Sequence, residues 1–143
     1  MLTLVLSRIG FDARHGATAV EQRSSRRFEV DVEIEAPLER PQSSDRLEDT
    51  IDYRTVADVI VQVGTAAEPC HLIEALARQM LDALAERIPH AAFHLELRKL
   101  NPPDCPGAPE YAAVRLSRPA TPRGRGAKGT PASEAPQTPS EIR

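Results

Sequence analysis

Two charged residues occupy positions where the surrounding pattern calls for apolar ones. Glu74 interrupts the apolar stripe of a helical segment, because at about 100° per residue it points almost the same way as Leu81. Lys99 keeps the parity of the inward-facing Leu95 and Leu97 in an alternating segment. A carboxylate or an ammonium beside a core must find partners in neighbouring side chains or in a ligand. Both residues are therefore candidates for a ligand site, against the simpler readings of a partly exposed Glu74 and a frayed strand end at Lys99.

Cysteine and histidine residues give little support to metal chemistry. Cys70 and Cys105 do not form a CxxC pair, which argues against both a disulfide framework and a zinc ribbon. No pair among these cysteines and His71, His90 and His94 has the spacing of a structural zinc site. We therefore expect two free thiols, no metal and no cofactor.

Four segments show the mixture or alternation of apolar and polar residues that is typical of strands with one buried face. They are Leu2 to about Arg14, residues 28–36, residues 92–99 and residues 111–118. The second is the clearest, since its apolar residues face one way and its acidic residues the other. Gly10 in the first segment predicts a bulge or a point of close approach.

Two helices are predicted between the second and third strands. Asp52 can cap a helix that begins at Tyr53, with Gly64 as a left-handed cap at its end. A second helix runs to about Ile88, with Pro69 suited to its first position. The order ββααββ predicts an α+β fold, in which a four-stranded antiparallel sheet carries both helices on one face. Its edge strands could pair with another subunit.

The composition indicates a soluble chain with an aliphatic core. The chain has 143 residues, a formal net charge of −3 and 3% aromatic residues, and no apolar run approaches the ~18 residues of a membrane span. Residues 1–6 lack a basic lead-in and a small-residue cleavage site, so we interpret them as a strand and expect a cytoplasmic location. A domain of residues 1–118 buries only about two-thirds of its unfolded-chain surface, and oligomerisation would help it.

The composition changes after residue 118. Residues 119–143 are rich in Pro, Gly, Ser, Thr, Lys and Arg, with Ile142 as the single bulky aliphatic residue, so we expect a disordered tail. Its basic stretch, residues 122–128, could attract RNA but has no aromatic residue for base stacking. A solubilising extension is the favoured interpretation, and no nucleic-acid partner is expected.

Several motifs between Leu2 and Arg118 resemble dihydroneopterin aldolase, a member of the tunnelling-fold family of pterin and purine binders. In chain order the motifs are His15-Gly16 with Glu21 and Phe28-Glu29-Val30-Asp31-Val32, then Asp49-Thr50-Ile51-Asp52-Tyr53, then Leu72-Ile73-Glu74-Ala75-Leu76-Ala77, and finally Lys99. The chain departs from the family pattern at Ser25-Arg26, where Gly-Gln is common. The resemblance implies a β-barrel ring of subunits, a homotetramer or homo-octamer, with each active site shared between neighbours.

The resemblance also implies a reaction and roles for the site residues. The reaction is retro-aldol cleavage of 7,8-dihydroneopterin in folate biosynthesis, without a metal, because the C6=N5 imine of the substrate accepts the electron pair. Glu74 and the backbone of Ile73 would hold the pterin ring, whose 2-amino-4-oxo edge offers parallel N–H donors. Lys99 would be the general acid and base, and Tyr53 from a neighbouring subunit would relay a proton. Glu21 would hold the hydroxylated side chain of the substrate or a water.

Two other functions fit the same residues. An epimerase of dihydroneopterin or its triphosphate would use the same cleavage followed by re-addition, and a phosphate-binding cluster of Arg23, Arg26 and Arg27 would favour it. A non-catalytic subunit that binds a pterin or purine would show binding without turnover. Product analysis separates the first two, because only the aldolase releases glycolaldehyde.

Overall fold

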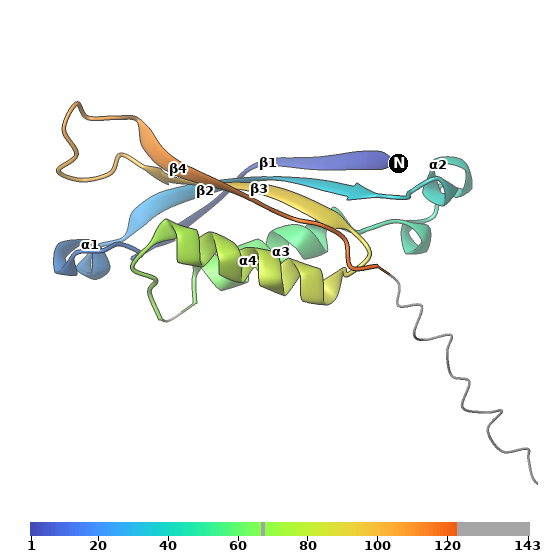
Figure 1. Cartoon of the computed structure of the whole chain (residues 1–143), viewed down its shortest axis with the longest axis horizontal. Coiled ribbons are helices and arrows are strands. Elements are labelled where there is room, and N and C mark those ends of the chain that lie inside the picture. The colour runs from blue at the N-terminus through green and yellow to red at the C-terminus, as the bar shows by residue number, and fades with distance from the viewer. Residues whose placement is uncertain (67, 123–143) are drawn as a thin grey trace, which may run out of the picture.

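Four antiparallel strands form one sheet in the order β1-β2-β3-β4, and two helices cover one of its faces (Figure 1). The elements are β1 (Leu2–Ala13), β2 (Arg26–Ala36), α3 (Tyr53–Gly64), α4 (Ile73–Arg87), β3 (Ala92–Leu100) and β4 (Tyr111–Arg118). The structure, a computed structural model, describes residues 1–66 and 68–122. The predicted α+β fold with its ββααββ order is confirmed. The ring assembly concerns several subunits and stays a prediction.

Three short helical turns lie at the two ends of the sheet and were not predicted. Helix α1 (Ala19–Arg23) lies between β1 and β2 at one end, and α2 (Arg40–Ser44) and η1 (Leu47–Asp49) lie at the other (Figure 1). Segments of three to five residues are too short to show a helical period. The sequence pattern therefore indicated loops at these places.

The apolar face of β2 forms the centre of the core. Its alternate residues Phe28, Val30, Val32, Ile34 and Ala36 are at most 1% exposed, because β2 lies between β1 and β3 and the two helices cover this face of the sheet. The buried residues of the two helices are Val56, Val59, Ile60 and Gly64 of α3 and Leu76, Ala77, Met80, Leu81 and Leu84 of α4. Each fully buried large aliphatic side chain contributes about 1.5–3 kcal/mol. The core is mainly aliphatic, as the composition predicts, and it also contains the chain's three phenylalanines, Phe11, Phe28 and Phe93.

The irregular point of β1 is Arg8 and not Gly10. The pairing of β1 with β2 shifts in register around Arg8, which has a φ of 60° and donates its backbone N–H to Asp31 Oδ1 at 2.7 Å. Gly10 pairs regularly with Glu29, so a bulge there is wrong. Close approach is the correct alternative, since a Cβ on Gly10 would lie 2.2 Å from Nη2 of Arg27.

The two ends of α3 differ in how well they were predicted. Asp52 is the N-cap, as expected, and its side chain accepts the backbone N–H of Arg54 at 3.0 Å. Gly64 as a left-handed cap is wrong, because the capping residue is Thr65 with a φ of −104°. The reason for a glycine is packing: a Cβ on Gly64 would lie 2.6 Å from the ring of Phe11.

The start of α4 also differs from the prediction. The helix begins at Ile73, after the extended N-cap residue Leu72, so Pro69 does not occupy the first helical position. Between Pro69 and Leu72, the backbone of Cys70 donates its N–H to His15 Nδ1 at 2.9 Å. This bond ties the loop to the end of β1, which leaves the first helical turn to begin three residues later.

The last described strand, β4, ends at Arg118, and the domain bounds of residues 1–118 stay a prediction. Thr121 donates its N–H to the carbonyl oxygen of Pro89 at 2.9 Å, and residues 123–143 of the predicted tail lie outside the described residues. None of the helices in residues 1–66 and 68–122 has both the length and the apolar character to cross a membrane. Cys70 and Cys105 are free thiols.

Candidate active site

Glu21 and Lys99 form an ion pair on the helix-covered face of the sheet. Lys99 Nζ donates to Glu21 Oε2 at 2.8 Å, and the two side chains are only 13% and 9% exposed. Lys99 pairs with Phe28 of β2, which confirms its predicted inward direction. The hydrogen bond from Lys99 holds the pKa of the Glu21 carboxyl below its ordinary value, although burial acts in the opposite direction. The site thus contains an ammonium group and a carboxylate that are hydrogen-bonded to each other and largely shielded from bulk water.

Helix α1 fixes the position of Glu21 through a capping box. Thr18 Oγ1 accepts the backbone N–H of Glu21 at 3.2 Å, and Glu21 Oε1 accepts the backbone N–H of Thr18 at 3.3 Å. The carboxylate therefore holds its own helix with one oxygen and Lys99 with the other. A threonine followed by glutamate three residues later is the sequence signature that could have revealed α1.

Gly16 gives the Glu21 side chain the room that it occupies. A Cβ on Gly16 would lie 2.4 Å from Glu21 Cβ and 2.6 Å from Glu21 Cδ. The backbone of Gly16 is held in place because its N–H donates to the carbonyl oxygen of Cys70 at 3.0 Å and its oxygen accepts from Gln22 Nε2 at 2.8 Å. A side chain at this position would therefore displace the carboxylate and not the backbone.

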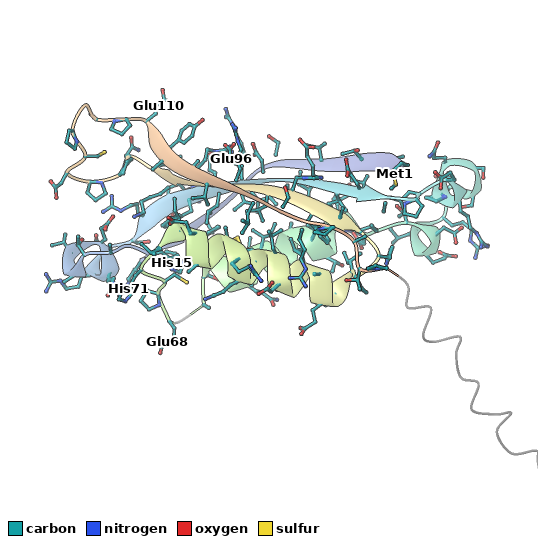
Figure 2. All side chains as sticks on the ribbon, in the orientation of Figure 1. Met1, His15, Glu68, His71, Glu96 and Glu110 are labelled. Atoms are coloured by element: carbon teal, nitrogen blue, oxygen red, sulfur yellow. The ribbon has the colours of Figure 1, made fainter. Side chains whose placement is uncertain are left out.

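His15 joins the three segments around the site. Its ring is 2% exposed, and its Nε2–H donates to the carbonyl oxygen of Gly64 at 2.7 Å while its Nδ1 accepts the N–H of Cys70 at 2.9 Å. A carbonyl can only accept and an amide can only donate, so these two bonds require the neutral ring with its proton on Nε2. Figure 2 shows His15 and His71 at the end of the molecule opposite Met1. In the sequence, His15 is recognisable only as part of the His15-Gly16 motif, and no spacing indicates this positioning role.

Ile73 and Glu74 begin α4 at the same end of the molecule, because Cys70, just before them, is bonded to Gly16. Ile73 is half-buried, whereas Glu74 is exposed. In the described part of the chain, the Glu74 carboxylate has no hydrogen bond or ion pair. The expectation that Glu74 borders the buried side is wrong for the single chain, because no described residue covers its carboxylate. Leu72 beside it is 54% exposed.

Tyr53 lies at the other end of α3 from the ion pair. It is the first residue of this helix of 12 residues, while Gly64, which contacts His15, is the last. At about 1.5 Å per residue the two ends are about 16 Å apart. Tyr53 is 56% exposed and lines an open cavity of about 230 Å³ with Leu4 and Leu47. One chain therefore pairs Glu21 with Lys99 and begins α4, with Ile73 and Glu74, at the same end of the molecule, whereas Tyr53 lies at the other end.

The opposite face of the sheet carries a separate charged cluster around Arg98. Its Nη1 and Nη2 each donate to a carboxylate oxygen of Asp31 at 2.9 Å, Nη1 also donates to Glu96, and the guanidinium lies 5.6 Å from the centre of the Tyr111 ring. Arg98 lowers the pKa of the Asp31 carboxyl and is itself held charged by Asp31. Figure 2 shows Glu96 on the face away from the helices. The hydrogen bonds of the Arg98 guanidinium go to carboxylates of the same cluster, which is typical of a structural site.

Solved structures share the architecture. The chain superimposes with a TM-score of 0.75 on Escherichia coli dihydroneopterin aldolase in complex with neopterin, at 18% identity, over 82% of this chain and 99% of that one. A Burkholderia dihydroneopterin aldolase bound to guanine gives a TM-score of 0.66, at 22% identity, over 82% and 89%. The sheet and its two covering helices therefore define a protein of the tunnelling-fold class.

The sequence comparisons identify the family within this class. The model "FolB: Dihydroneopterin aldolase" matches residues 4–117. A dihydroneopterin aldolase of Streptococcus pyogenes serotype M18 is 35% identical over 114 residues, which are 79% of this chain and 92% of the relative. The chain belongs to the dihydroneopterin aldolase family, as its ordered motifs predict.

Proposed function

We propose that the protein cleaves 7,8-dihydroneopterin by a retro-aldol reaction to 6-hydroxymethyl-7,8-dihydropterin and glycolaldehyde. Family membership places the chain among the lyases of folate biosynthesis. The observation that carries the proposal is the ion pair between Lys99 Nζ and Glu21 Oε2, 2.8 Å apart and largely shielded from water. A shielded acid and base near a carboxylate free to bind a ring suit a reaction that consists of proton transfers.

The ring is held at the start of α4. The exposed carboxylate of Glu74 can accept two parallel N–H bonds from the 2-amino-4-oxo edge of a pterin. The backbone N–H of Ile73, in the first helical turn, has no partner within the helix and is available to the ring. Relatives support this mode, since the E. coli enzyme is in complex with neopterin and the Burkholderia enzyme is bound to guanine, which has a similar edge.

The proton steps follow from the ion pair. Lys99 and Glu21 act together to take the proton of the 2′-hydroxyl; the C1′–C2′ bond breaks, and its electron pair moves through C6 to N5 of the ring. Glycolaldehyde leaves, and the carbon C1′ then receives a proton, so that no proton is gained or lost overall. Glu21 Oε1 also orients the hydroxylated side chain. A general acid and base of this kind typically accelerates a reaction about 10²–10⁴-fold.

A neighbouring subunit supplies Tyr53 to relay a proton at N5 or C1′. This proposal is supported by the position of Tyr53, exposed at the far end of α3, and by β1 and β4, which are the two edges of the sheet and each pair on one side only in the described chain. Exposed apolar residues at the two ends, Leu47 and Leu72, fit contacts between copies. We propose a homotetramer or homo-octamer that closes into a β-barrel ring.

The proposed catalytic unit is the domain of residues 1–118, followed by the tail of residues 119–143. Its location is proposed to be the cytoplasm, the compartment in which unpaired cysteines such as Cys70 and Cys105 normally persist as thiols.

The test compares binding with turnover in two variants. Purified Glu74→Ala and Lys99→Ala proteins are titrated with neopterin by calorimetry and assayed with 7,8-dihydroneopterin. We expect Glu74→Ala to lose affinity, and Lys99→Ala to keep most of its affinity and lose rate. Glu86→Ala is the matched control, because Glu86 is an exposed carboxylate on the other end of α4. Equal losses of affinity and rate in both variants would contradict this division of roles.

The same assay distinguishes the alternatives. Release of glycolaldehyde supports the aldolase, and formation of monapterin alone supports the epimerase. Binding of neopterin without turnover by the wild type would instead indicate a non-catalytic pterin-binding subunit.

A further inference from the structure

Three arginines between α1 and β2 point to different places. Arg23 ends α1 and is exposed. Arg27 is exposed on the outer face of the sheet, where its Nη1 lies 3.5 Å from Asp12 Oδ2. Arg26 has the parity of the buried Phe28 and is half-buried on the helix-covered face. Of the three, Arg26 alone shares the face of the ion pair.

Arg26 lies next to Lys99 on this face. Phe28 pairs with Lys99, so Arg26, two residues before Phe28, is the diagonal neighbour of Lys99, with Cβ atoms about 7–8 Å apart. Its Nη1 lies 3.5 Å from the carbonyl oxygen of Asn101, which directs the guanidinium toward β3. The head group therefore extends from β2 toward the strand that carries the catalytic amine.

The guanidinium of Arg26 is incompletely bonded. Its Nε is buried and has no acceptor in the described chain, and no carboxylate of residues 1–66 or 68–122 lies within ion-pair distance. By contrast, Arg27 has Asp12 and Arg98 has Asp31. A buried donor without a partner destabilises a fold by about 1–3 kcal/mol. Because the side chain as a whole is only half-buried, an anionic oxygen from a ligand can reach the guanidinium, which no described carboxylate pairs with.

The order of groups across the sheet indicates which part of the ligand carries that oxygen. Helix α4, which begins with Ile73 and Glu74, packs over β3 and β4, whereas Arg26 lies on β2, which neighbours β3 on the side away from β4. A pterin ring at Glu74 with its C1′–C2′ bond at Lys99 directs the end of the side chain toward Arg26. We propose that Arg26 binds a phosphate at this end and makes dihydroneopterin 3′-monophosphate a preferred substrate, an inference that rests on the proposed function.

The reaction with this substrate breaks the same bond and conserves protons in the same way. The 2′-hydroxyl loses its proton, the C1′–C2′ bond breaks and C1′ gains a proton, while the phosphate ester stays intact on the two-carbon fragment. The products are 6-hydroxymethyl-7,8-dihydropterin and glycolaldehyde phosphate. No oxidant, reductant or second substrate is required.

The experiment measures kcat/KM for 7,8-dihydroneopterin and for its 3′-monophosphate, with wild type, Arg26→Gln and Arg27→Gln. A charged hydrogen bond to a phosphate corresponds to about a 10- to 100-fold effect. We expect the wild type to prefer the monophosphate by this factor, Arg26→Gln to lose the preference mainly through a lower kcat/KM for the monophosphate, and Arg27→Gln to behave as wild type. Arg26→Lys should keep part of the preference, because it keeps the charge.

Binding measured without turnover separates this inference from the proposed function. Neopterin 3′-monophosphate and neopterin are titrated into the same proteins by calorimetry, and thermal unfolding shows that each variant is folded. Tighter binding of the phosphate form that depends on Arg26 supports the inference even if neither substrate is cleaved, which would overturn only the cleavage reaction. Equal affinity of the wild type for both ligands, or the same loss for both in Arg26→Gln, overturns the role of Arg26.

Discussion

Arg98 and Lys99 are consecutive residues of β3 that point to opposite faces of the sheet, and their surroundings differ in kind. Arg98 is saturated by Asp31 and Glu96 and packs on Tyr111. Lys99 pairs with a single carboxylate, that of Glu21, among the described residues. A guanidinium keeps its proton under all ordinary conditions, whereas an amine can release one. The comparison indicates that β3 carries a structural charge, Arg98, on one face of the sheet and a charge that can exchange protons, Lys99, on the other.

Lys99→Arg should give the largest effect, because it keeps a charge opposite Glu21 and removes the ability to exchange a proton. We expect turnover of 7,8-dihydroneopterin to fall about 10²–10⁴-fold. The free energy of unfolding should fall less in Lys99→Arg than in Lys99→Met, because Lys99→Met leaves Glu21 without its ion-pair partner. Steady-state assays and urea denaturation measure the two quantities. Substantial activity in Lys99→Arg would show that proton exchange does not depend on this side chain.

Arg98→Met should reverse the pattern of Lys99→Arg. It leaves the carboxylates of Asp31 and Glu96 without their shared cation, so we expect the free energy of unfolding to fall by about 2–3 kcal/mol. Below the unfolding transition, kcat should stay within about twofold of the wild type, since Arg98 lies on the other face. Urea denaturation and steady-state kinetics provide the measurements. A kcat that falls by more than tenfold in the folded variant would contradict the separation of the two faces.

Gly16→Ala should reduce turnover by about tenfold, through the placement of Glu21. The new Cβ would lie 2.4 Å from Glu21 Cβ, so the carboxylate must move away from Lys99. Gly64→Ala is the matched control, because its Cβ would meet the Phe11 ring at 2.6 Å and not the ion pair. That variant should lose about 1–3 kcal/mol of stability with little change in kcat. Equal kcat losses in both variants would mean that Gly16 acts through general packing.

The smallest expected effect is a pH dependence of stability. Because the pKa of Glu21 is lowered in the folded protein from its ordinary value of 4.5, its ionised form stabilises the fold above that pH. The stabilisation is lost as pH falls through the folded pKa. Wild type should therefore exceed Glu21→Gln in unfolding free energy near pH 7, and the difference should shrink below pH 4.5. A difference that stays constant from pH 7 to pH 3, measured by urea denaturation, would contradict the role of the charge.

Regular elements were predictable where one physical signal dominates a long segment. The alternation of β2 gave its buried face, the bounds of β4 agree with the expected residues 111–118, and the Asp52 cap located the start of α3. The parity of Lys99 gave its direction for the same reason. Short elements and local packing were not predictable: α1 has five residues, and the reason for a glycine at position 64 is the Phe11 ring.

The candidate site shows the same limit. The motifs named Glu21, Tyr53, Ile73, Glu74 and Lys99, but no periodicity could show that Glu74 is exposed in the single chain or that Tyr53 lies at the far end of α3. Helical direction predicts which way a side chain points. Burial depends on whether another element covers that point, and only packing decides this.

The sequence by itself determined the family, the strand and helix order and the inward direction of Lys99, because these depend on residue types and on periods along the chain. The tertiary structure decided that Glu21 pairs with Lys99, residues that are 78 positions apart. It also decided that His15 bridges α3 to the loop before α4 and that Arg26, among three arginines, faces the site. These contacts depend on the register of strands and the crossing of loops, which are fixed only when the whole core packs.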